Sequence, residues 1–169
     1  MLFDKNNKII FSKDEIIIFT SQHTAHYKTA AKMFLDKPYF GHGPKMFRIL
    51  CSNERYYSVS KNKNSGCSSH PHNTYLQLLA ETGLFGMSIF SLGFIYITYN
   101  LIKHLFMMIF YRKKSLTDYQ IVLSVTAIIT FWPFSPAGNI FNNWLLIVYS
   151  IPIGFYANEF FGCKKVSKS

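Results

Sequence analysis

Three apolar runs follow one another in the second half of the chain, after a more polar first half. Residues 84–102 are nineteen positions without a formal charge, which at about 1.5 Å per helical residue nearly cross a hydrocarbon core of ~30 Å. Residues 119–134 form a shorter run and residues 140–161 a longer one. The last run also contains polar residues and a proline: Asn142, Asn143, Pro152 and Glu159. One such run is typical of a buried core helix, but three in 169 residues predict an all-α integral membrane protein.

Helical spacing is also found before the first of these runs. Between residues 23 and 36, apolar side chains recur at three- and four-residue intervals. They predict a helix that ends before Pro38, because the residue preceding a proline avoids helical geometry. A second helix is predicted to begin at Asn73, a favourable N-cap, and to stop at Gly83. Its apolar stripe consists of Leu76, Leu79 and Ala80.

The segments around these two helices are interpreted as connections. The β-branched residues between positions 8 and 20 predict either a pair of strands or an extended lead-in. Residues 38–48 predict a tight turn with two glycines, and residues 52–69 predict a mobile polar loop. Residues 1–83 then form a partly helical domain that precedes the first transmembrane helix.

The distribution of charge predicts the orientation in the membrane. Basic residues cluster in the 103–118 connection and in the 162–169 tail, whereas the 135–139 turn carries no charge. The clustered residues are Lys103, Arg112, Lys113 and Lys114 in the connection, and Lys164, Lys165 and Lys168 in the tail. Under the positive-inside rule both basic segments lie in the cytoplasm, and the turn and residues 1–83 lie outside.

An outer location of residues 1–83 requires a route across the membrane. The first residues have no apolar signal region and no cleavage site. Either the helix at 84–102 carries the preceding residues across, or spans that come before this sequence are missing from it. We favour the second interpretation, in which the chain is the C-terminal part of a longer multi-span protein. Trp132 and Trp144, which bracket the 135–139 turn, agree with an outer aromatic belt.

The net charge of +10 raises the question of nucleic-acid binding. The sequence contains no recognisable nucleic-acid-binding motif, and topology together with anionic lipid explains the basic clusters. We therefore expect membrane lipids, and no nucleic acid, among the partners.

The three cysteines are divided between the two sides. Cys51 and Cys67 lie in the outer domain, whereas Cys163 lies at the cytoplasmic end. A Cys51–Cys67 disulfide is expected if the compartment is oxidising, and two unrelated free thiols are the alternative.

Five of the six histidines fall within residues 1–83: His23, His26, His42, His70 and His72. Because imidazole suits zinc or copper, a metal-binding membrane protein without catalytic activity is one hypothesis. However, a His-Pro-His sequence is not a chelating helical pair, and no carboxylate or thiolate recurs at ligand spacing. No metal ligand and no cofactor is assigned.

A phosphate-handling site is the second hypothesis. The GHGPK turn offers backbone amides and the Lys45 ammonium, and Arg48 adds a fork-shaped donor that fits phosphate oxygens. His72 comes just before the Asn73 cap, where the helix dipole favours anions and a neutral imidazole. A neutral histidine beside an anion site suits general-base chemistry near pH 7. Since the following proline holds His70 extended, the rings of His70 and His72 are expected to point apart.

Two stretches are similar to a known family. KTAAKMFLDKPYFGHGPKMFR (residues 28–48) resembles the helix, proline turn and Gly-x-Gly-x-x-x-Phe motif of the bacterial O-antigen ligase/O-antigen polymerase superfamily. HPHNTYLQLLAETGLFG (residues 70–86) resembles its His-Asn-x-Tyr-Leu-x-x-Leu-x-Glu-x-Gly-x-x-Gly motif. The resemblance covers roughly residues 21–161, and the second motif is the more specific.

The resemblance implies a multi-span GT-C-type helical bundle in the bacterial inner membrane, with residues 1–83 in the periplasm. Such a glycosyltransferase moves an oligosaccharide from undecaprenyl diphosphate to lipid A-core, in lipopolysaccharide or cell-surface polysaccharide biosynthesis. A polymerase of the same superfamily moves it to another glycan repeat unit. Neither needs a cofactor or metal. His72 stands at the motif histidine, the base that deprotonates the acceptor hydroxyl, and family arginines hold the donor diphosphate.

One family feature is missing from this chain. Where the family often has an arginine four residues before an aromatic, this sequence has His23 and Tyr27. Either His23 or His26 takes over this role, or Lys45 and Arg48 do, or the activity has changed. The expected substrate-binding residues are therefore His23, His26, Lys45, Arg48, His70 and Asn73.

Overall fold

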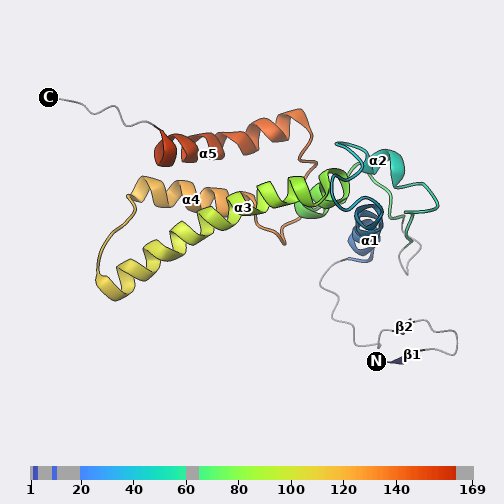
Figure 1. Cartoon of the computed structure of the whole chain (residues 1–169), viewed down its shortest axis with the longest axis horizontal. Coiled ribbons are helices and arrows are strands. Elements are labelled where there is room, and N and C mark those ends of the chain that lie inside the picture. Colours follow the sequence, from blue (N-terminus) through green and yellow to red (C-terminus); the bar gives the residue numbers. More distant parts are fainter. Residues whose placement is uncertain (1, 4–8, 11–19, 60–64, 163–169) are drawn as a thin grey trace.

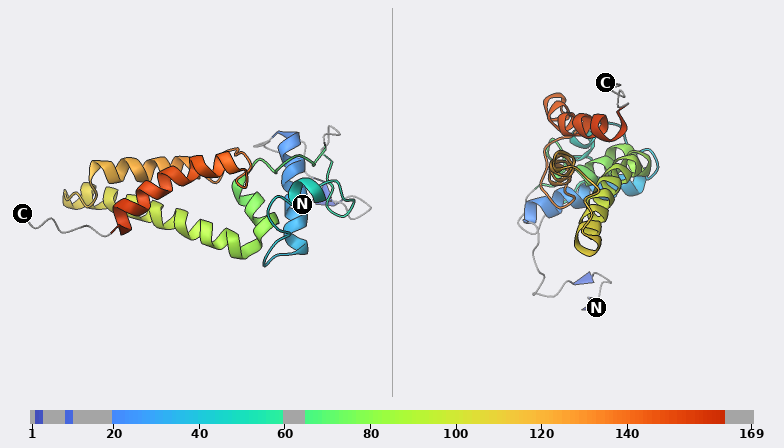
Figure 2. Two further views of the ribbon diagram at one scale, coloured as in Figure 1. Left: turned by 90° about the horizontal axis from the view of Figure 1, so that it is seen from above. Right: turned by 90° about the vertical axis from the view of Figure 1, so that its left-hand side faces the viewer.

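The computed structural model describes residues 2–3, 9–10, 20–59 and 65–162, and most of these are helical. The elements are β1 (Leu2–Phe3), β2 (Ile9–Ile10), α1 (Ser21–Asp36), α2 (Phe47–Leu50), α3 (Thr74–Tyr111), α4 (Asp118–Thr130) and α5 (Asn143–Phe161). Helices α3, α4 and α5 extend in the same general direction, with α4 in contact with both others, and α1 packs across the beginning of α3 (Figures 1 and 2). The two short strands pair antiparallel. Positions 11–19 of the expected strand pair lie outside the described residues.

Helix α1 confirms the helix expected over residues 23–36 and begins two residues earlier. The Thr20 side chain caps it by accepting a hydrogen bond from the amide of His23. It ends at Asp36, with Lys37 as the C-cap just before Pro38. Its buried positions are Ala25, His26, Thr29, Ala30 and Met33. These side chains fall on one helical face, which packs against α3 and the loops around it.

Gly83 interrupts α3 where the sequence predicted that the first helix stops and the first span begins. Gly83 has a left-handed φ of 65°, which kinks the helix, and the helix then continues to Tyr111. The helix can resume because the backbone of the 38–48 turn takes the place of a preceding helical turn. The amide of Leu84 donates to the carbonyl of Pro38 (2.7 Å), and the amide of Phe85 donates to that of Tyr39 (3.1 Å). The amides after the kink therefore find acceptors.

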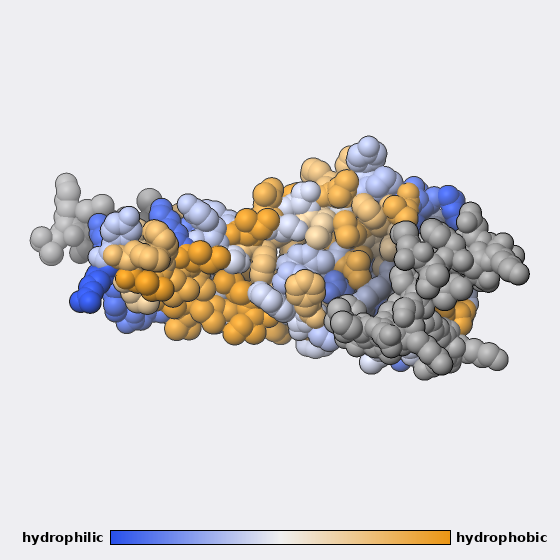
Figure 3. All heavy atoms as spheres, turned by 90° about the horizontal axis from the view of Figure 1, so that it is seen from below, coloured by the Kyte–Doolittle hydropathy of each residue, from blue (hydrophilic) through white to orange (hydrophobic). Residues whose placement is uncertain are grey.

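Two described helices, α3 and α5, are long and apolar enough to cross a membrane. The 84–102 span expected from the sequence lies within α3. Helix α4 has only 13 residues and is about 20 Å long, short of a ~30 Å hydrocarbon core. It stops at Thr130, before Pro133, instead of continuing to residue 134. Hydrophobic side chains cover much of the surface of this helical region, and hydrophilic ones cover its end near the α3–α4 connection (Figure 3).

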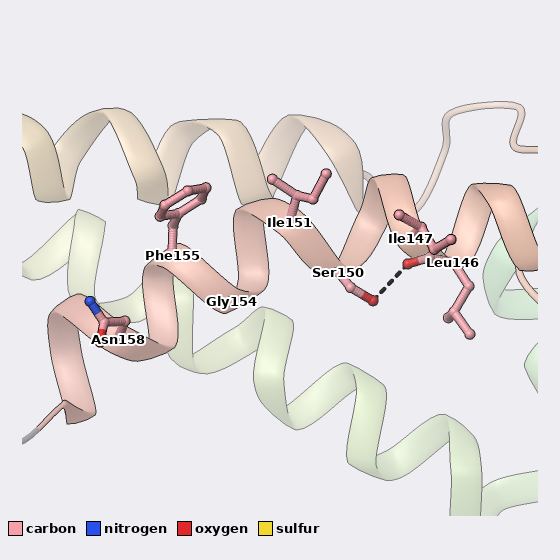
Figure 4. Close-up of a pocket in the computed structure, with 7 residues that line it drawn as sticks. All are labelled: Leu146, Ile147, Ser150, Ile151, Gly154, Phe155 and Asn158. Carbon is pink, nitrogen blue, oxygen red and sulfur yellow. Dashed lines mark hydrogen bonds between the residues drawn. The ribbon is translucent and has the colours of Figure 1, made fainter.

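Helix α5 begins at Asn143, three residues later than the apolar run. Asn142 occupies the N-cap position, but its side chain makes no capping hydrogen bond. One face of α5 is an open groove of about 570 Å³ (Figure 4). Its lining residues all belong to this helix: Leu146, Ile147, Ser150, Ile151, Gly154, Phe155 and Asn158. The Ser150 hydroxyl donates to the carbonyl of Leu146 (2.6 Å), so it is satisfied within the helix.

Candidate functional site

Four of the five histidines in the first half of the chain meet where α1 crosses the start of α3. His23 and His26 are three residues apart on α1 and thus share one side of it. The ring centroid of His72 lies 4.2 Å from that of His70, 5.4 Å from that of His26 and 5.6 Å from that of His23. We call these four residues the histidine cluster, and His72 is its centre.

The expectation that the rings of His70 and His72 point apart was wrong. His72 has a left-handed φ of 58°, which is uncommon for a residue other than glycine. This conformation lets the His72 ring lie against the His70 ring although Pro71 separates them. A non-glycine residue held in this region costs about 1–3 kcal/mol, and such residues concentrate at functional sites.

The four rings differ in their hydrogen bonds. His70 uses both nitrogens, because Nε2 donates to the carbonyl of Ala137 (3.2 Å) and Nδ1 pairs with the Ser69 hydroxyl (2.8 Å). His26 is only 1% exposed, yet neither of its ring nitrogens has a hydrogen-bond partner among the residues that the structure describes. The partly exposed ring of His72 makes no hydrogen bond with any residue that the structure describes. The cluster therefore contains one anchored imidazole and two with free nitrogens.

Burial keeps the centre of the cluster uncharged. It lowers the pKa of His72 to about 4, and the neighbouring His70, His26 and His23 act in the same direction. Burial also lowers the pKa of His70, although the hydrogen bond to the Ala137 carbonyl opposes this effect. The electrostatic neighbours that shift the pKa of His72 are all histidines, with no carboxylate among them in the described part of the chain. His72 is thus a neutral imidazole at pH 7, as the sequence predicted.

The segment between α4 and α5 forms a wall of the site, which the sequence did not reveal. The amide of Ala137 donates to the carbonyl of His72 (3.0 Å). The Gln77 amide group donates to Asn139 (2.7 Å) and accepts from the amide of Ile140 (3.2 Å). The only signal in the sequence was the presence of uncharged polar residues, Gln77 and Asn139, next to apolar runs.

Asn73 joins the same wall to the start of α3. Its side-chain oxygen accepts from the amide of Leu76 (3.0 Å), so the predicted N-cap is confirmed. Its side-chain nitrogen donates to the carbonyl of Pro133 (2.7 Å). One asparagine therefore caps the helix and fixes the 131–142 segment beside His72.

The GHGPK turn does not offer the free amides that the sequence suggested. The amide of His42 donates to Ala80 (3.1 Å) and that of Gly43 donates to Glu81 (2.8 Å), so α3 occupies both. Lys45 has a left-handed backbone, and Arg48 is exposed on α2. Neither is among the electrostatic neighbours of His72, whereas Arg48 acts on Glu81. The structure therefore does not bring Lys45 and Arg48 into the histidine cluster.

His42, the fifth histidine, belongs to a separate polar group at the end of α1. Its Nε2 donates to the carbonyl of Met33 (3.1 Å) and lies 3.5 Å from the Asp36 carboxylate. The hydroxyl of Tyr56 donates to Asp36 (2.6 Å), and this bond is the main cause that lowers the pKa of Asp36. Arg55 also pairs with Asp36. These contacts tie α1 to the loop after α2 and leave His42 outside the candidate site.

A disulfide lies close to the cluster in the chain. Cys51, which is fully buried, is bonded to Cys67, with 4.9 Å between their Cα atoms. Cys67 precedes His70 by three residues, so the bond attaches the histidine-bearing segment to the C-terminal end of α2.

The positions of the side chains also bear on the metal hypothesis. In the described ranges, no group of three or more His, Cys, Asp or Glu residues is placed so that it could hold a metal ion.

Comparison with known proteins yields one family. The family model for O-antigen ligase matches residues 20–91, which contain α1, α2, the histidine cluster and the kink in α3. The match supports membership of the O-antigen ligase/O-antigen polymerase superfamily, a group of glycosyltransferase-like membrane enzymes. No curated protein and no solved structure matches the chain.

Proposed function

We propose that this chain is part of an O-antigen ligase-like membrane glycosyltransferase. It transfers an oligosaccharide from undecaprenyl diphosphate to lipid A-core at the periplasmic face of the bacterial inner membrane. The family match over residues 20–91 supports the class of enzyme, and the apolar helices α3 and α5 support its place in a membrane. The site itself lies before the kink in α3, next to the expected first span.

The reaction is a displacement at the anomeric carbon of the donor sugar. A hydroxyl oxygen of the acceptor attacks this carbon with inversion, and His72 takes the hydroxyl proton. The bond between the carbon and the diphosphate oxygen breaks, and undecaprenyl diphosphate leaves. Because a diphosphate already leaves readily, a base and stabilisation of its negative charge are sufficient catalysis.

The observation that carries the proposal is the state of the His72 ring. It lies at the centre of the cluster, it is neutral at pH 7, and its nitrogens are free of hydrogen bonds with described residues. A base must present an unoccupied nitrogen to the acceptor hydroxyl, and His70 cannot, because both its nitrogens are engaged. Of these two motif histidines, His72 is therefore the better candidate.

The test is a transfer assay with a His72→Gln variant of the full-length protein. Glutamine keeps a polar group of similar length but cannot act as a base, so we expect the rate to fall by about 10²–10⁴-fold. The assay follows polymer attached to lipid A-core in a strain that lacks its own ligase. Lys28→Gln is the matched control, because Lys28 is exposed on α1 and takes no part in the site. Unchanged transfer by the His72 variant, at equal protein levels in the membrane, would exclude the base assignment.

Expression of the same proteins in two host strains distinguishes a ligase from a polymerase. A ligase restores attachment of finished polymer in the ligase-deficient strain. A polymerase instead restores chain length in a strain that lacks its own polymerase. Restoration of chain length alone would identify this protein as a polymerase and retain His72 as its base.

A further inference from the structure

The histidine cluster has an unusual charge balance. Two members of the cluster lie on α1 and two lie in the loop before α3, and all four are imidazoles. Among the described residues, the electrostatic neighbours of His72 include no carboxylate, lysine or arginine. His26 is buried, and within the described ranges both its ring nitrogens lack a hydrogen-bond partner. A buried polar group without a partner costs about 1–3 kcal/mol, so native proteins rarely keep one without a reason.

We propose that the histidine cluster is an anion site that takes up a proton when it binds the diphosphate of a lipid-linked donor. The proton is carried by one of the three other imidazoles, so that His72 stays neutral as the base, and the donor supplies the negative charge that keeps this imidazole protonated. The identity of the anion rests on the function proposed above. The proton comes from the solvent and is bound by an imidazole nitrogen of the cluster.

Burial is the main cause that lowers the pKa of His72 and His70, and repulsion between the imidazoles acts in the same direction. Rings with centroids 4.2–5.6 Å apart cannot carry several positive charges in a partly desolvated site. An anion within a few ångströms shifts the equilibrium from neutral imidazole to imidazolium, because the opposite charge stabilises the imidazolium form and raises its pKa. The bound state therefore holds more protons than the free state, and by linkage the affinity increases as the pH falls.

The surroundings of each ring agree with this assignment. On α1, His23 stacks with Tyr27 at a centroid distance of 6.1 Å and lies at the partly exposed edge of the cluster. The 67–73 segment contributes His70, and the 131–142 segment contributes the carbonyl of Ala137, a neutral acceptor. His26 is the most buried of the four, and neither of its ring nitrogens pairs with another described residue. In the described part of the chain, no negative side chain is among the electrostatic neighbours that shift the pKa of His72 or His70, so none competes with the incoming anion.

The test measures proton uptake during binding. The probe is a short-chain dialkyl diphosphate diester, which stays fully ionised between about pH 5 and 8, so any titration belongs to the protein. Calorimetric titration of the full chain in nanodiscs, in two buffers of different ionisation enthalpy, gives the number of protons bound. We expect about one proton per diester, and an affinity that weakens about tenfold for each unit of rising pH within this window.

Two variants locate the proton-binding groups. His26→Gln keeps a polar side chain that cannot be protonated, and we expect it to reduce the proton uptake and the pH dependence. Because His26 is buried, His23→Gln at the exposed edge serves as a second variant if the first is unstable. Lys28→Gln removes a positive charge from the same helix outside the cluster, so its effect should be small and independent of pH.

Three results would overturn the inference. Diester binding without proton uptake and without pH dependence would exclude proton coupling, while glycan transfer by the same preparation would leave the proposed function intact. Binding that requires added zinc and is abolished by a chelator would replace the inference by a metal-bridged site. No diester binding at any pH would contradict both the inference and the proposed donor site.

Discussion

At the scale of single residues, left-handed backbone conformations hold the site together. Gly41 and Gly83 both have a φ of 65°. The residues just before Gly83 lie against Gly41, and the residues just before Gly41 lie against Gly83. A Cβ atom at Gly41 would lie 2.4 Å from the backbone of Glu81, and one at Gly83 would lie 2.4 Å from that of Tyr39. The first glycine motif and the kink in α3 are therefore two halves of one close contact, and the phosphate role expected for the turn is not needed to explain its glycines.

We predict that Gly83→Ala destabilises the protein. The new methyl group would collide with the backbone of Tyr39, and alanine disfavours the left-handed conformation, which together should cost about 1–3 kcal/mol or more. The melting temperature in detergent measures the effect. Gly93→Ala is the matched control in the same helix, because a Cβ there meets no atom within 4 Å. Alanine is also the better helix former, so this variant should be as stable as the parent. Equal melting temperatures for both variants would contradict the contact.

The sequence predicted the structural role of a residue correctly where the residue type and its neighbours in the chain decide that role. The Asn73 cap follows from residue type and position alone. The arrangement of the His70 and His72 rings was not predictable, because nothing in the sequence indicates that a non-glycine residue adopts a left-handed φ. The orphaned nitrogens of His26 likewise depend on what packs around α1, which the spacing of apolar residues does not describe.

At the scale of elements, the candidate site joins parts that are distant in the sequence. Helix α1, the 67–73 segment and the 131–142 segment each contribute to the surroundings of His72. Helix α1 meets α3 along its buried face, whereas the other two segments are held by hydrogen bonds and by the Cys51–Cys67 bond. The disulfide is therefore expected to limit the motion of the segment that carries the motif histidines.

We predict that the Cys51–Cys67 bond forms in cells and stabilises the domain. Cross-linking residues sixteen positions apart should contribute about 3 kcal/mol by restricting the unfolded chain. Alkylation before and after reduction, followed by mass measurement, should show one reactive thiol without reductant and three with it. Cys163→Ser is the control, because removing that thiol should leave the melting temperature unchanged while Cys51→Ser lowers it. Alkylation of all three thiols without reductant would show that the bond is absent.

The helices themselves were largely predictable from hydrophobic spacing, and their ends were less so. The end of α1 was correct because a proline follows it. The stop at Gly83 was also correct. The start of the next helical part was not predictable, because its first amides donate to the carbonyl groups of Pro38 and Tyr39, forty-six residues earlier in the chain. The shorter α4 and the folded segment after it were missed because a run of apolar residues does not distinguish a helix from an ordered loop packed on one.

At the scale of the whole molecule, the candidate site and the basic connection lie at opposite ends of α3. The histidine cluster surrounds the start of this helix, and the helix leads from there to Arg112 and the α3–α4 connection (Figure 1). Trp132 and Trp144, both at least half exposed, lie near the end that carries the site. This arrangement matches a helix that crosses from an aromatic belt on the outer side to a basic cytoplasmic side.

We predict that the site faces the periplasm. The test compares two engineered cysteines in a Cys163→Ser background, Lys28→Cys on α1 and Lys113→Cys in the α3–α4 connection, both at exposed positions. A membrane-impermeant maleimide added to intact spheroplasts should label the first and not the second, because the positive-inside rule keeps the basic connection in the cytoplasm. After permeabilisation both should react, which shows that each thiol is accessible. Labelling of only the Lys113→Cys protein in intact spheroplasts would reverse the topology. A cytoplasmic histidine cluster would then have no access to a periplasmic acceptor, so this measurement tests the membrane orientation on which the transfer to lipid A-core depends.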